Sequence, residues 1–518
     1  MTLHRIGLIA VAGVLAAAPV FAQGNPRTRR ARMEAEQQAE QQQAGQSPEK
    51  KAPEQKPMPP VEKSSVTHHS ARIGGETINY TATAATYVIK DDEGNPKATF
   101  FFVAYTKDGV PDISKRPISF VYNGGPGSAS LFTHMGMGPE RVVLTEDGHG
   151  MPAPYTITDN EDSFLDATDL VFIDAVSTGY SRPAPGQNPK QFYGVVEDAN
   201  IFSDFIYQYI TRNERWDSPK FLIGESYGTT RSAELSGVLE HRHNMYLNGI
   251  VLVSTVAFAN WGADDRYEFD LPTYATSAWY HHLLSPDLQA KTVDEIAQEA
   301  REFTNGEYAQ ALQKGDEISR DEYQKVVRDY ARLTALSPTF IEECNLRVSP
   351  FRWFKELERN KRRTMGRLDT RFEGIDRDAA GEAPEYDPSE ASYLGAFVAT
   401  FQDYVRRDLK WDSDAYYTVT ANVRPWDRNG GTEVAETLRS AMTEETNLKV
   451  LVVCGYYDLA TPFGGIEHTV SHMDLDPTIR PHISFAYYQS GHMVYIDTKA
   501  RNKLHKDVDN FINANYSH

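Results

Sequence analysis

The sequence predicts an α/β fold, with a mainly parallel central sheet, helices on both faces and a helical insertion. Strand-like apolar runs alternate with helix-like runs between residues 77 and 254, a pattern typical of parallel strands joined by right-handed crossovers. Between about residues 261 and 447 the alternation stops and the chain becomes helix-like and charged. The chain has 518 residues, 40% of them hydrophobic, which is enough to bury a large core.

Apolar periodicity then predicts the elements in order. Before the insertion it predicts strands at 77–88, 98–105, 118–122 and 170–174, a helix at 196–209, a strand at 221–223, a helix at 232–239 and a strand at 249–254. Within the insertion it predicts helices at 279–284, 293–303, 323–336 and 393–409, and after it strands at 449–454 and 482–488 and a helix at 499–512. An insertion between two late strands lies near their carboxyl ends, so we expect it to form a cap over a substrate.

The N-terminal region divides into two predicted segments that precede the α/β body at 64–518. Residues 1–22 have a short basic start, an apolar run and a small-residue end at Ala22, and they resemble a secretory signal peptide. An uncleaved membrane anchor is the alternative. Residues 23–63 are rich in Gln, Glu, Lys, Pro and Arg and are expected to be a disordered polar linker. We therefore expect export, to the periplasm or outside the cell.

Composition excludes several classes of function. The formal net charge of −19 argues against nucleic acid as a partner, because phosphates would be repelled. The only two cysteines, Cys344 and Cys454, are expected to be free thiols and not a disulfide framework. No HExxH, Cys-x-x-Cys or phosphate-binding loop is found, so we expect neither a metal nor a cofactor.

The segment Gly224-Glu225-Ser226-Tyr227-Gly228 lies between a predicted buried strand and a predicted helix. A serine on such a sharp turn is held clear of its neighbours, and glycines on either side let the turn close. The pattern predicts a nucleophile elbow with Ser226 as the nucleophile. An ordinary glycine-serine loop is the alternative for this motif alone.

A serine nucleophile needs a histidine base, and the base needs a carboxylate that orients it. Asp458 follows the strand predicted at 449–454, and His492 follows the strand predicted at 482–488. The chain order Ser226, Asp458, His492, each just past a strand end, is the order of a catalytic triad on an α/β-hydrolase fold.

An oxyanion hole is predicted at Asn123-Gly124-Gly125-Pro126-Gly127, directly after the strand at 118–122. Glycines let backbone amides approach a developing oxyanion closely. We assign the donors to the amides of Gly125 and Tyr227, the second being the residue after the nucleophile. A structural glycine-proline turn is the alternative.

These four motifs together resemble the signatures of the serine carboxypeptidase family, and especially its bacterial branch, from about residue 73 to the C-terminus. The resemblance implies an α/β-hydrolase fold with an inserted cap, and release of single amino acids from peptides with a free C-terminus. It assigns Asn123, Gly124 and Glu225 to binding the terminal carboxylate, and places Tyr180 and Met493 in the substrate pocket. A Glu beside an anionic substrate must share a proton with it, which favours activity in acid.

The sequence also departs from the pattern of many eukaryotic members. Val121, Ser128 and Gly136 stand where those members have Trp, Cys and a second Glu, so the carboxylate site is reduced. Ala175 and Ser177 stand where relatives usually have Pro and Gly.

The sequence therefore predicts a secreted or periplasmic serine carboxypeptidase that works through an acyl-enzyme. An esterase or acyltransferase with the same triad is the alternative within the fold, and a non-catalytic binding protein on a hydrolase scaffold is the alternative of another class. The sequence predicts neither the preferred side chains around the cleaved bond nor the oligomeric state.

Overall fold

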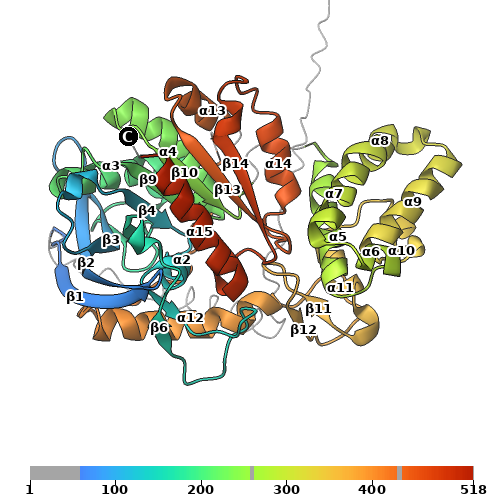
Figure 1. Ribbon diagram of the computed structural model, residues 1–518, viewed down its shortest axis with the longest axis horizontal. Helices are drawn as coiled ribbons and strands as arrows, with labels where there is room; N and C mark the ends of the chain where they lie inside the picture. The colour runs from blue at the N-terminus through green and yellow to red at the C-terminus, as the bar shows by residue number, and fades with distance from the viewer. Residues whose placement is uncertain (1–58, 257–261, 429–433, 517–518) are drawn as a thin grey trace, which may run out of the picture. The chain divides into compact units, whose positions relative to one another are not determined.

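A twisted central sheet organises the computed structural model, which describes residues 59–256, 262–428 and 434–516 (Figure 1). Its strands lie in the order β1 (Ser64–Ile73), β2 (Glu76–Lys90), β3 (Pro96–Lys107), β7 (Asp169–Ile173), β4 (Ile118–Tyr122), β9 (Lys220–Glu225), β10 (Gly249–Val253), β13 (Lys449–Gly455) and β14 (Ile483–Tyr488), with β8 (Arg182–Pro183) beside β3. The pairings from β1 to β7 are antiparallel, and those from β7 to β14 are parallel. The predicted fold class, an α/β-hydrolase fold, is confirmed.

Helices cover both faces of this sheet, because alternate strand residues point to opposite faces. Phe100 and Phe102 of β3 belong to one hydrophobic core, whereas Phe101 and Val103 belong to the other. The first core is closed by α3 (Val195–Arg212), α4 (Tyr227–His243), α13 (Val434–Glu444) and α14 (Phe463–Ser471). The second is closed by α2 (Leu131–Met137), α12 (Pro388–Arg407) and α15 (Thr498–Ala514), the last drawn red in Figure 1.

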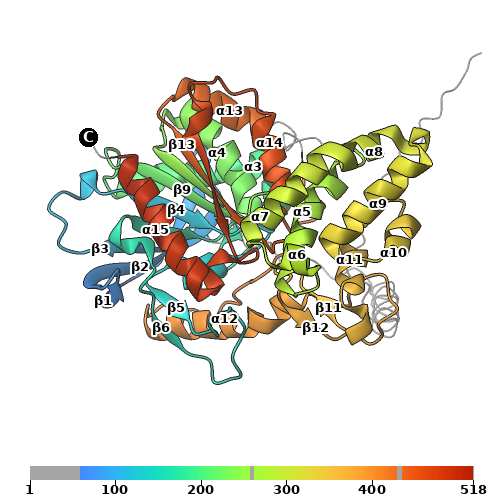
Figure 2. The same ribbon diagram turned by 45° about the vertical axis from the view of Figure 1, so that its right-hand side comes forward.

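The inserted segment between β10 and β13 contributes no strand to the sheet in its described residues, and most of its helices share a third core (Figure 2). These helices are α5 (Asp265–Tyr280), α6 (Pro286–Gln289), α7 (Val293–Phe303), a π-helical turn (Thr304–Tyr308), α8 (Ala309–Lys314), α9 (Arg320–Thr334), α10 (Pro338–Glu343) and α11 (Pro350–Glu356), followed by the hairpin β11 (Thr364–Met365) and β12 (Glu373–Gly374). Capping boxes at Thr292 and Ser319 begin α7 and α9. Helices α12 and α13 pack on the sheet instead, so the predicted insertion divides between two environments.

Shorter elements connect these layers. They are the hairpin β5 (Glu140–Val142) and β6 (Ile157–Asp159) and the 3₁₀ turns at Ile113–Lys115, Phe164–Asp166, Pro189–Phe192, Gly315–Glu317, Arg359–Lys361, Arg480–His482 and Val494–Ile496. Among the described helices, none combines the length and the apolar character needed to cross a bilayer. Both cysteines are buried and free, as predicted.

Three differences between the predicted and the observed elements concern β1, α5 and α4. Strand β1 was not predicted, because its residues alternate between exposed and half-buried positions and carry few apolar side chains. The helix predicted at 279–284 is wrong, since α5 ends at Tyr280 and begins well before it. The helix after the elbow begins at Tyr227, five residues before its predicted start at Ser232.

The predicted signal peptide and residues 23–58 of the predicted linker lie outside the described residues. The end of that linker already contacts the sheet. The Glu62 carboxylate accepts a hydrogen bond from the Val88 amide at 2.9 Å and pairs with Arg212 at 2.8 Å, and the Lys63 amide donates to Thr86 Oγ1 at 2.9 Å.

Candidate active site

Ser226 occupies a sharp turn between β9 and α4. Its φ is 59° and its ψ is −127°, a left-handed backbone conformation that is strained for a serine. The turn is tight, because a Cβ atom on Gly224 would lie 2.2 Å from the carbonyl oxygen of Gly228. The Ser226 amide donates to the carbonyl of Val253 at the end of β10, at 3.0 Å. Ser226 is half-buried while its neighbours Glu225 and Tyr227 are buried. This is the geometry of the predicted elbow.

Asp458 and His492 lie together beyond the ends of β13 and β14. His492 Nδ1 is 2.8 Å from Asp458 Oδ2, and the two side chains are 7% and 0% exposed. The other carboxylate oxygen, Asp458 Oδ1, accepts from the amides of Ala460 and Thr461 at 2.8 and 3.0 Å. Both carboxylate oxygens of Asp458 face hydrogen-bond donors. The carboxylate can therefore hold the His492 ring with Nδ1 protonated and Nε2 free to accept a proton.

The serine and the histidine are brought to the same edge of the sheet. Ser254, the first residue after β10, donates its hydroxyl to the His492 carbonyl at 2.5 Å. Ser226 is bonded to Val253, the residue before Ser254. Among the described residues, none forms a hydrogen bond with Ser226 Oγ, so the predicted nucleophile and the predicted base are not hydrogen-bonded to each other in this structure. Such contacts often tighten only when substrate binds.

The electrostatics of His492 are set by opposing effects. Burial disfavours the charged ring and would lower its pKa, but the Asp458 carboxylate and its hydrogen bond raise it, and Glu225 adds to the rise. The net result is a pKa above the ordinary value of 6.5. A raised pKa suits a base that must keep the proton it takes from a serine hydroxyl.

The glycine turn at 123–127 packs directly against the elbow. A Cβ atom on Gly124 would lie 2.3 Å from the amide nitrogen of Tyr227, so only glycine allows this approach. Gly125 has a φ of 106°, which favours glycine as well. Within the described residues, neither the Gly125 amide nor the Tyr227 amide donates to a protein acceptor. Both donors are thus free to bind a substrate oxygen.

Asn123 and Glu225 form a buried pair beside the nucleophile. Asn123 Nδ2 donates to Glu225 Oε1 at 2.8 Å, while Asn123 Oδ1 accepts from the amide and the hydroxyl of Thr133, both at 3.0 Å. Glu225 is 4% exposed, and its Oε2 has no hydrogen-bond partner among the described residues. Burial raises the pKa of Glu225 to about 7, although His492 and the nearby Tyr495 hydroxyl act to lower it.

The two predicted pocket residues lie in different surroundings. Met493 follows His492 directly and is buried in the second sheet core. Tyr180 is half-buried in an aromatic cluster with Phe101, Trp411 and Tyr417. None of the described contacts joins Tyr180 to Ser226, Asp458 or His492.

Two features of the site were missed in the sequence. Thr461 donates its hydroxyl to Asp458 Oδ2 at 2.5 Å and lies 3.1 Å from His492 Nδ1. Thr461 lies three residues after Asp458, and this closeness in sequence is the signal that could have identified it.

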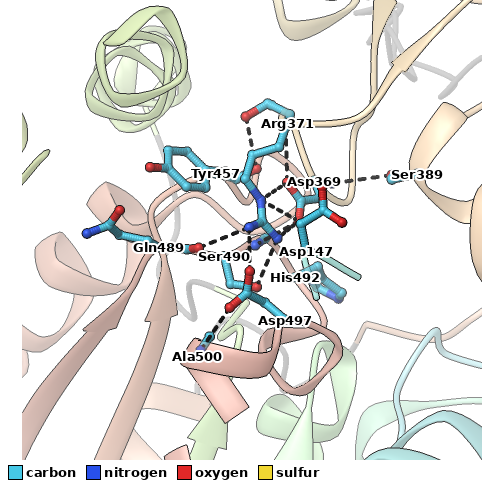
Figure 3. A network of polar contacts seen from close by, with 12 residues as sticks. Asp147, Asp369, Arg371, Ser389, Tyr457, Gln489, Ser490, His492, Asp497 and Ala500 are labelled. Atoms are coloured by element: carbon cyan, nitrogen blue, oxygen red, sulfur yellow. Dashed lines mark hydrogen bonds and ion pairs between the residues drawn. The ribbon is translucent and has the colours of Figure 1, made fainter. Parts of the chain in front are cut away.

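The second missed feature is the segment 367–371, which braces the loops that carry Asp458 and His492. The amides of His492 and Gly491 donate to Leu368 O at 2.7 Å and to Asp369 Oδ2 at 3.1 Å. Figure 3 shows the centre of the brace, where buried Arg371 pairs with Asp369 at 2.7 Å and with Asp497 at 2.9 Å. The local sequence does not mark these residues, because tertiary packing sets their partners beyond the segment. Gly491 lies 122 residues from Asp369, and Asp497 lies 126 residues from Arg371.

Comparison with solved structures returned matches of low sequence identity. A proline iminopeptidase from Mycobacterium smegmatis is 13% identical, with 83% of this chain and 98% of that chain covered and a TM-score of 0.37. A thermostable carboxyl esterase from Bacillus coagulans is also 13% identical, with the same coverage and a TM-score of 0.38. A search of curated protein sequences returned no significant relative.

The sequence profile described as serine carboxypeptidase matches residues 77–504, which include the elbow, the glycine turn and the loops of Asp458 and His492. The match covers well over half of the chain. The protein therefore belongs to the serine carboxypeptidase family and is a serine-type carboxypeptidase.

Proposed function

We propose that the enzyme cleaves C-terminal peptide bonds through an acyl-enzyme on Ser226. Ser226 Oγ attacks the scissile carbonyl while His492 Nε2 takes the hydroxyl proton, and Asp458 holds the ring. His492 then gives the proton to the leaving amine, and an ester remains on Ser226. Water, deprotonated by His492, hydrolyses the ester and frees the shortened peptide. The amides of Gly125 and Tyr227 stabilise the oxyanion in both steps.

The exopeptidase selectivity is proposed to come from Asn123, Gly124 and Glu225. The observation that carries it is Glu225: a buried carboxyl with one unpartnered oxygen, adjacent to the nucleophile, with its pKa raised to about 7 by burial. A protonated Glu225 can donate a hydrogen bond to a substrate carboxylate, and Asn123 Nδ2 has a second hydrogen to add. A peptide with a free C-terminus would thereby be placed with its last bond over Ser226.

The helical part of the insertion is proposed to cover the bound peptide. Support comes from Leu368 and Asp369, which belong to the insertion and bond the loop of His492. We also propose that the protein is exported, to the periplasm or outside the cell, through a cleaved signal at residues 1–22. N-terminal sequencing of protein from the exported fraction should then begin at Gln23, and intact Met1 in that protein would contradict cleavage.

Mass spectrometry of the products from a mixed peptide pool tests the proposed activity. We expect ladders in which residues are lost one at a time from the C-terminus, and no cleavage of the same peptides as C-terminal amides or at internal bonds. Labelling of Ser226 by a fluorophosphonate should block the ladders. Internal fragments, or hydrolysis of esters without any loss from peptides, would reject the carboxypeptidase proposal.

A further inference from the structure

A second cluster of chemically competent side chains lies in the helical insertion, outside the proposed triad. An open cavity of about 490 Å³ is lined by His281, Glu358 and Glu373, with Lys361 and Gln489 at its wall. One nitrogen of His281 and one oxygen from each glutamate all lie within 4.8 Å of one another. His281 directly follows α5 as its C-cap residue, Glu358 precedes the 3₁₀ turn Arg359–Lys361, and Glu373 begins β12.

The tautomer of His281 is fixed by its partner. His281 Nε2 lies 2.7 Å from the carbonyl oxygen of Thr370, which can only accept a hydrogen bond. Nε2 therefore carries the proton, and the lone pair of the neutral ring is on Nδ1. Metal-binding histidines commonly donate their other ring N–H to a backbone carbonyl in this way.

When the His281 ring is neutral, the atoms that face each other in the cluster are all acceptors. His281 Nδ1 lies 3.5 Å from Glu373 Oε1, and the His281 side chain is only 5% exposed. A lone pair opposite a carboxylate oxygen is repulsive unless a proton or a cation lies between them. The separation is close to the distance of about 3.4 Å between two ligands of a tetrahedral zinc ion, given metal–ligand bonds of about 2.1 Å.

Glu358 supplies an independent observation. Its side chain is 1% exposed, and its Oε1 pairs with Lys361, but its Oε2 has no hydrogen-bond partner among the described residues. A buried carboxylate oxygen without a donor is costly. Coordination of a cation by Oε2 would satisfy it without disturbing the ion pair with Lys361.

We propose that His281, Glu358 and Glu373 form a binding site for a divalent transition-metal ion, with Zn²⁺ as the best-matched ion. One imidazole and two carboxylates are a ligand set that zinc accepts, and the cavity gives the ion an entry path and room for a water ligand. Arg363 does not neutralise the cluster in place of a metal ion. It lies 3.7 Å from Glu373 and 43% of its side chain is exposed, so the ion pair contributes little to stabilising the charge of Glu373.

The site adjoins the brace of the catalytic loops. His281 binds the carbonyl of Thr370, and the amide of Thr370 in turn donates to the carbonyl of Tyr457, the residue before Asp458. Gln489, at the cavity wall, accepts from Arg371 at 3.1 Å through its carbonyl. A bound ion would therefore stabilise the segment 367–371, and its effect should be visible in the thermal stability of the whole chain.

Isothermal titration calorimetry with ZnCl₂ on the EDTA-treated full chain tests the site. We expect one saturable site in the wild type, and a loss of affinity of at least about tenfold in Glu373→Gln and in His281→Gln. Zinc should raise the melting temperature of the wild type and leave that of Glu373→Gln unchanged. Glu373 is partly exposed, so this variant is expected to fold, and circular dichroism in EDTA checks it.

The matched controls are Glu382→Gln, an exposed carboxylate of the same segment, and His282→Gln, which lines the cavity without belonging to the cluster. Both should bind zinc as the wild type does. Anomalous scattering at the zinc edge from soaked crystals should place the ion between His281 Nδ1 and the two glutamates. Absence of saturable binding, equal affinity in Glu373→Gln, or anomalous density only at other histidines would each overturn the proposal.

Discussion

The strained backbone of Ser226 is held by its neighbours and not by its own preference. A serine at a φ of 59° costs about 1–3 kcal/mol. Two contacts hold the turn in this conformation. Gly224 approaches Gly228 closely, and the Ser226 amide donates a hydrogen bond to the carbonyl of Val253. The strained conformation places Ser226 in the sharp turn between β9 and α4, where the proposed mechanism requires the nucleophile.

Replacing Ser226 or His492 by alanine should abolish peptide turnover. Since the members of a triad act as a unit, each single variant should lose about 10⁴- to 10⁶-fold in kcat, and the double variant little more than either. Single-turnover assays on folded protein measure this. The exposed pair Ser471→Ala and His472→Ala is the control and should keep wild-type rates. Independent, multiplicative losses would show that the two residues do not work together.

The side chain of Glu225 links substrate binding to the protonation of the base. Its pKa is raised to about 7 by burial, and its negative charge helps to raise the pKa of His492. In the proposed mechanism, the productive state has Glu225 protonated and His492 neutral. Because the two groups are coupled, a pH profile reports apparent values for the pair.

Glu225→Gln should therefore change the pH profile in two ways. The decline in kcat/KM as the pH rises through about 7, caused by ionised Glu225 repelling the substrate carboxylate, should disappear. The acid limb should move to lower pH, because the pKa of His492 is no longer raised by Glu225. In acid, where wild-type Glu225 donates its proton, the variant should show a higher KM for free-acid peptides.

Matched peptides with a free or an amidated C-terminus, assayed from pH 5 to 9, provide the measurement. The amides lack the group that Glu225 is proposed to hold, so their kcat/KM should show only the shift of the acid limb. If the substitution alters both substrates equally at every pH, Glu225 has a structural role, and the proposed basis of exopeptidase selectivity is lost.

At the scale of elements, the segment 367–371 connects the insertion to the two catalytic loops. Arg371 is 4% exposed and bonds two carboxylates, a serine hydroxyl and a backbone carbonyl (Figure 3). Its guanidinium neutralises Asp369 and Asp497, which lie on different sides of the His492 loop in the chain. The position of the base thus depends on a segment that is remote from it in sequence.

Arg371→Met should lower both the stability of the folded protein and its rate of peptide turnover. Loss of a buried partner leaves two carboxylates unpaired, which costs about 3–5 kcal/mol. Since Asp369 also holds the Gly491 amide, kcat should fall while the KM for peptides changes little. Thermal melts and steady-state kinetics measure both. Arg377→Met, at a side chain 79% exposed, should be neutral in both assays. Wild-type kcat in folded Arg371→Met would show that the brace does not position His492.

The sequence predicted the site residues that carry a local sequence signal and missed those that do not. The elbow, the glycine turn and the Asp458 and His492 loops follow strand ends, and glycine leaves a local signature in each. Helix α7 was predicted at its observed bounds because its capping box and its apolar face are both local. Arg371 was missed because its partners Asp497, Gln489 and Ser490 are brought to it by tertiary packing.

The missed elements have similar physical causes. Strand β1 is paired on one side only, so it needs few apolar residues to hold its place beside β2. Helix α5 contains Pro272 in its interior and several residues with low helix propensity, yet it forms because it is buried between the sheet-side helix α14 and the helices of the insertion. Tertiary contacts override the local preference at both places.

At the scale of the whole molecule, the N-terminal linker is expected to be dispensable. Deleting residues 23–58 should leave kcat/KM within about twofold and the melting temperature unchanged, because a polar segment of this composition carries little packing energy. Extending the deletion to Lys63 removes Glu62 and its bonds to Val88 and Arg212, and should lower the melting temperature by about 2 °C. A large loss of activity in the shorter deletion would show that the linker docks on the body.

Asp270, in the helical insertion, is expected to make the stability of the whole chain depend on pH. Asp270 of α5 is 1% exposed, and neither of its carboxylate oxygens has a hydrogen-bond partner among the described residues. Arg266, 3.5 Å away, is the nearest cation but is itself 53% exposed. Burial raises the pKa of Asp270 to about 7, Arg266 acts to lower it, and the uncharged hydroxyls of Tyr274, Tyr308 and Tyr330 lie around it.

Asp270→Asn should stabilise the protein, and more so at pH 8 than at pH 4. The unfolded chain loses the Asp270 proton near pH 3.8, but the folded chain keeps it until about pH 7. Between these values the folded state binds more protons, so the free energy of unfolding falls as the pH rises, and the loss is complete above pH 7. Asparagine is neutral throughout and removes this loss. We expect a gain in melting temperature of at least about 2 °C at pH 8 and under about 1 °C at pH 4. Asp316→Asn, at an exposed position, should shift neither value, and an equal gain at both pH values would mean that Asp270 does not titrate in this range.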